Sequence, residues 1–277
     1  MNTFRSNLHT HSIFSDGIHT AEEMVVTAIA LGFESLGFSE HSPVPYVHES
    51  ALESERLSEY ITEIRRLRDK YREEIEIYLG IEVEALHPIQ KTDFDYTIGS
   101  VHDIFCEDTQ EYYAVDNTPQ SLQKAITHIA GGNARTLVEY YYQRVADMLV
   151  NYQPDIVGHL DLIVKLNEGN RFFDESALWY KQLQEEVVDK VAQSGLIIEV
   201  NTGGIFRGYR KNPYPSKYML SFMHERGVPI TLSSDAHSKE SLNFYFDESL
   251  AMLKEIGYRN IMQMRKGAFV EVGVNWH

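Results

Sequence analysis

The stretch VPITLSSDAH, residues 228–237, joins a short apolar run to two side chains that can bind a metal ion. Residues 228–232 have the length and the β-branched content of a buried strand. Asp235 and His237 follow at the point where this strand is expected to end. The chain repeats this arrangement of an apolar run followed by an imidazole or a carboxylate, and the repetition predicts both the fold and the site.

Seven apolar runs alternate with longer stretches that carry apolar residues at the three-to-four spacing of amphipathic helices. Several runs are apolar on both faces, as in a parallel sheet covered by helices. Strand and helix repeated in this way predict one α/β barrel spanning residues 1–277, with the active site at the C-terminal ends of the strands. The expected strands are residues 4–9, 35–39, 75–83, 96–101, 155–158, 196–200 and 228–232. The expected helices are residues 21–31, 53–71, 119–129, 134–149, 176–193 and 215–226.

The composition is that of one large soluble domain. The chain has 277 residues, 43% of them hydrophobic, which is enough for one core, and this length does not require two domains. No run of about 18 apolar residues is present to span a membrane. The first residues lack the basic and apolar regions of a leader peptide. We therefore expect a soluble, cytoplasmic protein, while its oligomeric state stays open.

Charge and cysteine content restrict the partners and the metal chemistry. The chain has 41 acidic and 25 basic residues, and its net charge of -16 disfavours long nucleic acid and favours a small-molecule partner. The single cysteine, Cys106, excludes an internal disulfide framework and a thiolate zinc finger. Imidazole nitrogens and carboxylate oxygens must therefore hold any metal ion.

Nine residues near the ends of the apolar runs can bind metal. His9 and His11 lie two residues apart, and alternate residues of an extended strand point to the same side. Either this pair or the pair at 235 and 237 is weak evidence alone, but their joint occurrence favours one metal site. The nine candidates are His9, His11, Asp16, His41, Glu82, His102, His159, Asp235 and His237. The other histidines, expected to be solvated or local hydrogen-bonding side chains, are His19, His48, His87, His128, His224 and His277.

The number of candidate ligands predicts the number of ions. Nine groups exceed the three or four protein ligands of one catalytic zinc, and three divalent ions would accommodate them. Glu82 is the expected bridge because a carboxylate offers two oxygens, with Glu84 as the alternative. Three ions carry more positive charge than Asp16, Glu82 and Asp235 can neutralise, so the site is expected to attract a phosphate dianion.

Several motifs resemble those of the polymerase and histidinol phosphatase (PHP) superfamily. They are His9-Thr10-His11, Ser15-Asp16-Gly17, Ser39-Glu40-His41-Ser42 and Ser233-Ser234-Asp235-Ala236-His237. Within this superfamily the chain is most similar to the monofunctional histidinol-phosphate phosphatases. The segments that carry this similarity are Gly80-Ile81-Glu82, Gly99-Ser100-Val101-His102 and the loop 201–216.

This resemblance implies a distorted seven-stranded (β/α)7 TIM-like barrel and a trinuclear site of zinc, manganese or iron. It implies three ligand sets, which are His9, His11, Glu82 and Asp235 for one ion, Glu82, His102 and His159 for a second, and Asp16, His41 and His237 for a third. The implied activity is hydrolysis of L-histidinol phosphate to L-histidinol and phosphate, a step of histidine biosynthesis.

A mechanism follows from these expectations. A hydroxide shared by two ions would attack phosphorus without a phosphoenzyme, because metal binding lowers the pKa of water. Asp161, two residues after His159, is the candidate general acid for the leaving oxygen. Its alternative role is to orient a ligand imidazole.

Three loops are candidates for substrate binding. Residues 201–211 concentrate positive charge and are expected to be flexible. Arg207 is the first candidate for binding phosphate, followed by Arg210 and Lys211. The alternative is that these loop charges are simply solvated. The aromatic segments 46–48 and 105–113 could hold a heteroaromatic ring and an ammonium group, or could be ordinary loop residues.

Two other functions stay open. A PHP phosphoesterase that acts on nucleotides or short oligonucleotides would use the same metals with different loops. A catalytically silent, metal-stabilised binding module is disfavoured, because all nine candidate positions hold suitable residues.

Overall fold

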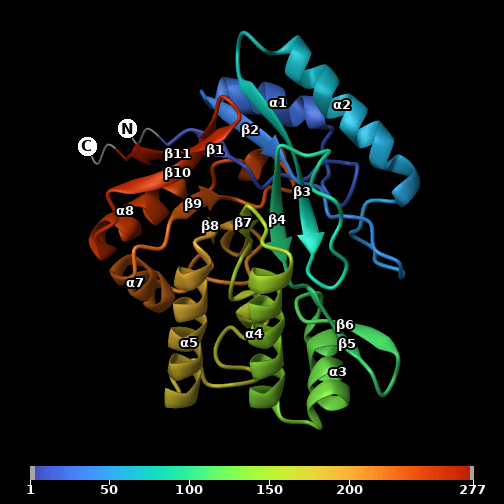
Figure 1. Ribbon diagram of the computed structural model, residues 1–277, viewed down its shortest axis with the longest axis vertical. Coiled ribbons are helices and arrows are strands. Elements are labelled where there is room, and N and C mark those ends of the chain that lie inside the picture. Colours follow the sequence, from blue (N-terminus) through green and yellow to red (C-terminus); the bar gives the residue numbers. More distant parts are fainter. Residues whose placement is uncertain (1–3, 275–277) are drawn as a thin grey trace.

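The computed structural model describes residues 4–274, and its centre is a seven-stranded parallel sheet curved into a nearly closed barrel (Figure 1). The strand order is β1-β2-β3-β4-β7-β8-β9, and every neighbouring pair is parallel. The expected barrel and its seven strands are therefore confirmed. The strands are β1 (Ser6–Asn7), β2 (Ser35–Phe38), β3 (Glu76–Glu84), β4 (Tyr96–Ser100), β7 (Ile156–Val157), β8 (Ile197–Asn201) and β9 (Ile230–Ser233).

The barrel closes where the segments that follow β1 and β9 meet. Thr10 and Ala236 form an isolated parallel bridge. The backbone N–H of His11 donates to the carbonyl of Ala236 at 2.8 Å, and the N–H of Ala236 donates to the carbonyl of His9 at 3.0 Å. The first and last strands of the sheet are thus joined through the two segments that carry the His-x-His and Asp-x-His patterns.

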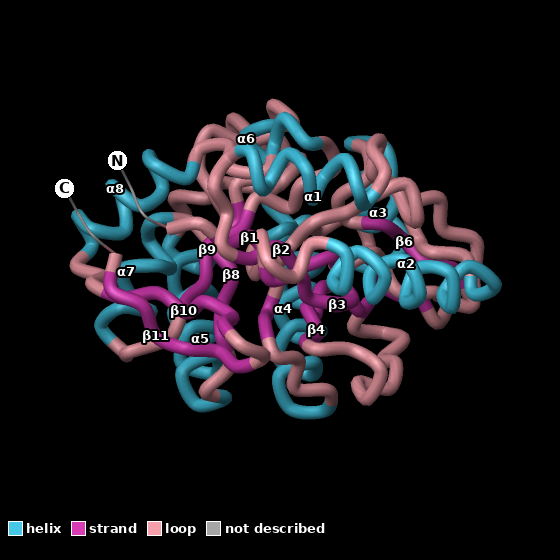
Figure 2. Tube along the Cα trace, turned by 90° about the horizontal axis from the view of Figure 1, so that it is seen from above, coloured by secondary structure: helices cyan, strands magenta, loops and turns pink. Residues whose placement is uncertain are grey.

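Helices surround the strands on the outside (Figure 2). The first begins as the sequence predicts, because Thr20 and Glu23 form a capping box in which each side chain accepts a hydrogen bond from the other residue's backbone. The stretch expected as one helix at 53–71 is a short 3-10 turn, Ser54–Arg56, followed by α2. The helices are α1 (Ala21–Ala30), α2 (Leu57–Lys70), α3 (Pro119–Ala130), α4 (Ala134–Asn151), α5 (Leu178–Ser194), α6 (Gly203–Phe206), α7 (Lys217–Glu225) and α8 (Phe246–Ile256).

Two hairpins and two helices were not expected from the sequence. The aromatic loop 105–113 belongs to an antiparallel hairpin of β5 (Asp103–Cys106) and β6 (Glu111–Ala114). Helix α6 lies within the loop that was expected to be flexible, and α8 follows the last strand of the barrel. A second hairpin, β10 (Asn260–Arg265) and β11 (Ala268–Gly273), places Met264 in an apolar cluster with barrel residues that include Tyr96 and Ile197.

No helix within residues 4–274 is long and apolar enough to cross a membrane. His277, expected to be an ordinary terminal side chain, lies outside the described residues.

Candidate metal centre

The nine candidate ligands meet at the carboxyl ends of the strands. The segment after β1 carries His9 and His11, and the turn that follows it carries Asp16. The other ligands lie at or just after the ends of five strands: His41 after β2, Glu82 near the end of β3, His102 after β4, His159 after β7, and Asp235 with His237 after β9. Ligand atoms that all lie within 4.8 Å of one another occur in four overlapping combinations of three or four of these residues. The parallel sheet therefore delivers residues from both ends of the chain to one place.

The first of the three expected ligand groups is His9, His11, Glu82 and Asp235, and four nitrogen–oxygen distances within it match those of a tetrahedral metal site. Nε2 of His9 lies 3.3 Å from Oε2 of Glu82 and 3.6 Å from Oδ1 of Asp235. Nε2 of His11 lies 3.6 Å and 3.4 Å from the same two oxygens. Ligands about 2.0–2.2 Å from a tetrahedral ion would be roughly 3.3–3.6 Å apart. These four nitrogen–oxygen distances are therefore those expected between ligands of one divalent ion.

Three of these atoms are orphaned polar groups. Within the described part of the chain, Nε2 of His9, Nε2 of His11 and Oε2 of Glu82 are buried and have no hydrogen-bond partner. A buried polar atom without a partner costs about 1–3 kcal/mol, so three that converge on one point require an explanation. A divalent cation would satisfy all three at once. The chemistry of the donor set, two imidazoles and two carboxylates, suits zinc, manganese or iron.

The second group uses the other oxygen of the same carboxylate. Oε1 of Glu82 lies 3.0 Å from Nε2 of His159 and 3.4 Å from Nε2 of His102. It also accepts a hydrogen bond from the Ser100 hydroxyl at 2.6 Å. Glu84, the alternative bridge, instead accepts from the backbone N–H of His102 at 3.0 Å and lies 3.2 Å from its Nδ1. The geometry thus places Glu82 between two groups and Glu84 behind the imidazole of the candidate ligand His102.

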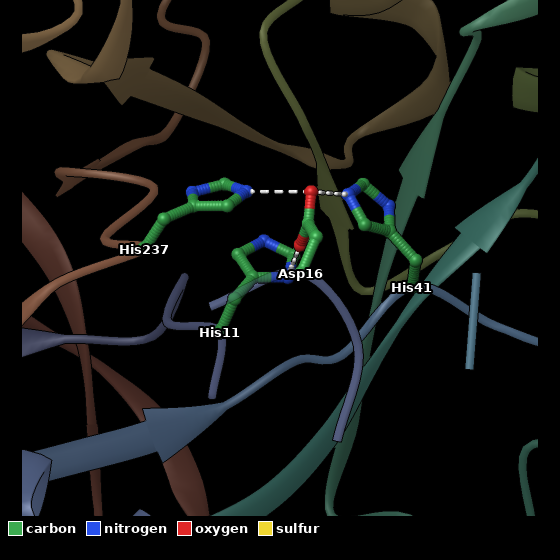
Figure 3. Close-up of side chains that lie close together, drawn as sticks. All are labelled: His11, Asp16, His41 and His237. Carbon is green, nitrogen blue, oxygen red and sulfur yellow. Dashed lines mark ion pairs between the residues drawn. The ribbon is translucent and has the colours of Figure 1, made fainter. Parts of the chain in front are cut away.

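Asp16 is the centre of the third group (Figure 3). Its Oδ2 lies 3.1 Å from Nε2 of His237 and 3.7 Å from Nε2 of His41. Oδ1 lies 3.6 Å from Nδ1 of His11, so this imidazole faces two groups. His41 also faces two groups, because its Nδ1 lies 2.9 Å from Oε2 of Glu82. The three groups therefore share residues and form one continuous cluster.

Mutual charge keeps the carboxylates of the cluster ionised, and the neighbouring carboxylates in turn raise the pKa of His9, His41 and His102 well above the usual range, against the effect of burial. Burial alone would raise the pKa of Glu82, but His9 and His41 outweigh it and hold that pKa well below its usual range. Asp235 has a lowered pKa in the same way, with Arg207 as the main opposing charge. Burial and the neighbouring histidines lower the pKa of His11 to about 3. Ionised carboxylates and neutral imidazoles are the forms that bind a cation, so His9, His41 and His102 would release their protons when an ion binds.

The PHP domain profile matches residues 7–203 of the chain. The chain belongs to the PHP domain family. This agrees with the resemblance that the short motifs carry. The matched region ends before Asp235 and His237, which the fold nevertheless brings to the same cluster.

Beyond the family profile, this PHP-domain chain is similar to individual proteins along most of its length. The probable histidinol-phosphatase of Schizosaccharomyces pombe is 29% identical over 266 residues, covering 89% of this chain and 84% of that protein. A Listeria monocytogenes structure, solved as a candidate histidinol phosphatase, superposes with a TM-score of 0.78 at 20% identity and covers 88% of this chain and 99% of that one. The histidinol phosphate phosphatase of Lactococcus lactis, solved with zinc, L-histidinol and phosphate, gives 0.69 at 22% identity and covers 96% and 98%.

Two buried carboxylates of this PHP domain were not predicted as site residues, although Glu40 belongs to one of the motifs in the sequence. Glu199, in β8, lies with Oε1 2.5 Å from Nδ1 of His9 and accepts the backbone N–H of His159 on Oε2 at 2.8 Å. Glu40, next to a candidate ligand, accepts hydrogen bonds from Ser12 and Ser15. Both are fully buried. The signal for Glu199 was available, because it is a charged residue inside the apolar run 196–200.

Asp161, the candidate acid, is two residues after His159, but its carboxylate contacts a residue outside the cluster. Its Oδ2 accepts the backbone N–H of Ser216 at 2.9 Å, and it is not among the described residues that line the cavity over the metal cluster. Its Oδ1 is buried and has no partner within residues 4–274. Burial raises the pKa of Asp161 to about 7.

The three basic candidates have different surroundings. Arg207 lines the cavity, and its Nη2 donates to Oδ2 of Asp235 at 2.8 Å. Arg210 instead donates two hydrogen bonds to Glu175, at 2.9 and 2.8 Å, and Lys211 is 85% exposed. Neither Arg210 nor Lys211 is among the described residues lining the cavity. The structure thus brings only Arg207 of the three to the site.

Another cation at the site, Lys165, was not predicted. It lines the cavity, and its ammonium group donates to Oδ2 of Asp116 at 2.8 Å and lies 5.1 Å above the ring of Tyr209. Lys165 therefore accompanies Arg207 in the cavity wall, although it follows a different strand, β7.

The cavity over the cluster has a volume of about 470 Å³, which suits a small molecule. One wall is aromatic: the rings of Tyr46 and Tyr112 stack with centroids 3.8 Å apart. The hydroxyl of Tyr46 donates to Oδ2 of Asp103 at 2.6 Å, and Nε2 of His48 lies 3.4 Å from the same oxygen. His48, expected to be an ordinary loop residue, therefore lies at the site. Other members of the aromatic segment line a separate surface cavity: Phe105, Glu107 and Asp108.

Proposed function

We propose that this chain is a metal-dependent phosphomonoesterase that hydrolyses L-histidinol phosphate to L-histidinol and phosphate in histidine biosynthesis. The observation that carries the proposal is the convergence of the orphaned buried atoms of His9, His11 and Glu82 beneath a cavity with cationic and aromatic walls. The similarity to named histidinol-phosphatases over most of their length supports the choice of substrate.

We further propose that three divalent ions, zinc, manganese or iron, occupy the cluster. The proposed ligands are His9, His11, Asp16, His41, Glu82, His102, His159, Asp235 and His237. When bound, such ions would supply an activated water and neutralise charge on the phosphate. Attack by this water would transfer the phosphoryl group directly, with no phosphoenzyme.

The protein's own groups would bind and orient the phosphate. Arg207 donates from Nη2 to the proposed ligand Asp235 and also lines the cavity, so the guanidinium can both hold a proposed ligand and bring positive charge to the phosphate. Lys165 adds a second positive charge to the cavity wall. These two cations are placed to attract a dianion into an otherwise acidic chain.

The aromatic wall is the proposed subsite for the rest of the substrate. The flat stack of Tyr46 and Tyr112 offers a ring face to an imidazole, and the Asp103 carboxylate beside it can accept a hydrogen bond from an ammonium or imidazole N–H. Asp161 is retained as a proposed proton donor because its raised pKa keeps it partly protonated near neutral pH.

The test is phosphate release by the metal-loaded protein, compared by kcat/KM for four substrates. They are L-histidinol phosphate, a nucleoside monophosphate, a phosphotyrosine peptide and a short oligonucleotide. We expect L-histidinol phosphate to be preferred by several orders of magnitude, and activity to disappear after chelation and return with metal. Comparable turnover of the nucleotide or oligonucleotide would discard the named substrate, and no turnover of any substrate would indicate a silent binding module.

A further inference from the structure

Glu40 is a buried carboxylate whose hydrogen bonds all lead to one turn. It lies after β2, is completely buried and immediately precedes the proposed ligand His41. Its Oε1 accepts the backbone N–H of Ser12 at 2.9 Å and the Ser12 hydroxyl at 2.5 Å. Its Oε2 accepts the backbone N–H of Ser15 at 3.2 Å and also the Ser15 hydroxyl. One side chain thus satisfies four donors of the segment 12–15.

That segment carries Asp16, the centre of the third group of ligands. Ser15 is the residue before it, and the Ser15 hydroxyl lies 3.4 Å from both Oδ1 of Asp16 and Nδ1 of His11. The turn is tight, because the N–H of Gly17 donates to the carbonyl of Ser12 at 3.0 Å. A Cβ at Gly17 would lie 2.6 Å from the Cα of Ser12, a contact that a larger residue could not make without moving the turn.

Asp16 also differs from the other proposed ligands in how it is supported. The others lie at or next to the ends of barrel strands, whereas Asp16 belongs to a turn that leaves the barrel and its side chain is 26% exposed. Its position therefore depends on what holds the turn. The Glu40 carboxylate is the buried group that ties this turn to the end of β2, from which His41 also comes.

We propose that Glu40 is a positioning residue that builds the metal site of Asp16, His41 and His237 by fixing the 12–15 turn against β2. The inference rests on the proposed function, because it assumes that this group binds an ion. It adds a residue that binds no ion itself and that controls one of the ions separately from the others. Groups behind the ligands commonly change metal affinity about 10–100-fold when they are removed.

Glutamine at position 40 is a sharp perturbation because its volume is nearly unchanged. A carboxylate accepts all four donors, but an amide has one accepting oxygen and an NH2 group. In either orientation the NH2 would face a backbone N–H and a hydroxyl of the same serine. The turn must then move away from β2, and Asp16 with it.

The experiment compares ions per chain in four proteins after loading with zinc and dialysis against a weak chelator: wild type, Glu40→Gln, Asp16→Asn and Asp155→Asn. Asp155 is the matched control, because it accepts the N–H and hydroxyl of Thr97, both at 2.8 Å, near the start of β4 and away from the cluster. We expect Glu40→Gln and Asp16→Asn each to retain one ion fewer than the wild type and the control. Titration should show the affinity of that ion reduced at least about tenfold in Glu40→Gln.

The possible results separate the two proposals. Loss of one ion in Asp16→Asn but not in Glu40→Gln would overturn the positioning role of Glu40. Loss of every ion in Glu40→Gln, with a collapse of the thermal transition, would also overturn it, because the effect would then be general. No loss in Asp16→Asn would overturn the assignment of an ion to Asp16 itself. Ser15→Ala, which removes one of the four donors, should give an intermediate affinity and a folded protein; wild-type affinity there would count against the proposal.

Discussion

Glu199→Gln tests whether Glu199 fixes the tautomer and the orientation of the proposed ligand His9. Oε1 of Glu199 faces Nδ1 of His9 at 2.5 Å and accepts the Ser233 hydroxyl. Oε2 accepts the N–H of His159 at 2.8 Å and Nδ2 of Asn201 at 2.9 Å. With the proton of His9 on Nδ1, its Nε2 is left free to face Glu82 and Asp235, as a metal ligand must.

The cost of the amide depends on its orientation, and both orientations are unfavourable. If the NH2 replaces Oε2, the N–H of His159 and the amide of Asn201 lose their acceptor, at about 1–3 kcal/mol each. If the NH2 replaces Oε1, the Ser233 hydroxyl can rotate to accept a hydrogen bond from it. His9, however, must then accept a hydrogen bond from the NH2 at Nδ1 and carry its own proton on Nε2, which prevents Nε2 from binding a metal ion. We expect zinc to bind the first group about 10–100-fold more weakly, or about 1.4–2.8 kcal/mol.

The assay is competition for zinc between the protein and a chelator of known affinity, with the thermal transition of the metal-free protein measured beside it. Asp155→Asn again serves as the control for loss of a carboxylate elsewhere in the barrel. Zinc affinity equal to that of the wild type, in a Glu199→Gln protein that is folded, would refute the reasoning. It would mean that packing alone fixes the tautomer and the orientation of His9.

Other changes give separate expectations. Arg207→Lys keeps the charge but cannot hold Asp235 with the same fork, so kcat/KM for phosphomonoesters should fall about 10–100-fold; unchanged kinetics would remove Arg207 from the site. Tyr112→Ala should raise KM for L-histidinol phosphate and leave a simple aryl phosphate less affected, which steady-state kinetics with both substrates would show. Chelation should lower Tm and added zinc should restore it, because metal bound to the native state stabilises it; a scan unaffected by metal would contradict the site. Burial raises the pKa of Asp161 from 3.8 to about 7, so its contribution to the stability of the metal-free protein should be present at low pH and be lost as the pH rises towards 7. Asp161→Asn should flatten this dependence of Tm on pH and, if Asp161 donates the proton, lower kcat; an unchanged pH dependence would show that the carboxyl is not buried in its neutral form.

The barrel strands could be predicted because each is a local pattern. The run expected at 96–101 is β4, Tyr96–Ser100, and the run expected at 196–200 is β8, Ile197–Asn201. Short β-branched runs bounded by polar residues leave little choice of structure. The placement of the candidate ligands followed from the same observation, since carboxyl ends of parallel strands must share one face of a barrel.

The unpredicted parts depend on contacts between distant residues. Arg210 looked like a phosphate ligand in the sequence, but Glu175, 35 residues earlier, binds its guanidinium and Val164 accepts another hydrogen bond from it. The β10–β11 hairpin has no obvious place in a seven-unit repeat. Its Met264 packs with Tyr96 and other barrel residues, a match that becomes visible only after the barrel has formed.

The spacing of the His-x-His and Asp-x-His pairs follows from the closure of the barrel. Thr10 and Ala236 form the parallel bridge between the two segments, and the hydrogen bonds on either side of the bridge use the backbone of His9 and His11. Because alternate side chains of an extended segment share a side, the residues that flank Thr10 both face the cluster, as do those that flank Ala236. The same backbone pairing thus joins the ends of the sheet and aligns four proposed ligands. A shift of one residue in this pairing would separate the two halves of the site, so the register of closure and the geometry of the metal cluster are fixed together.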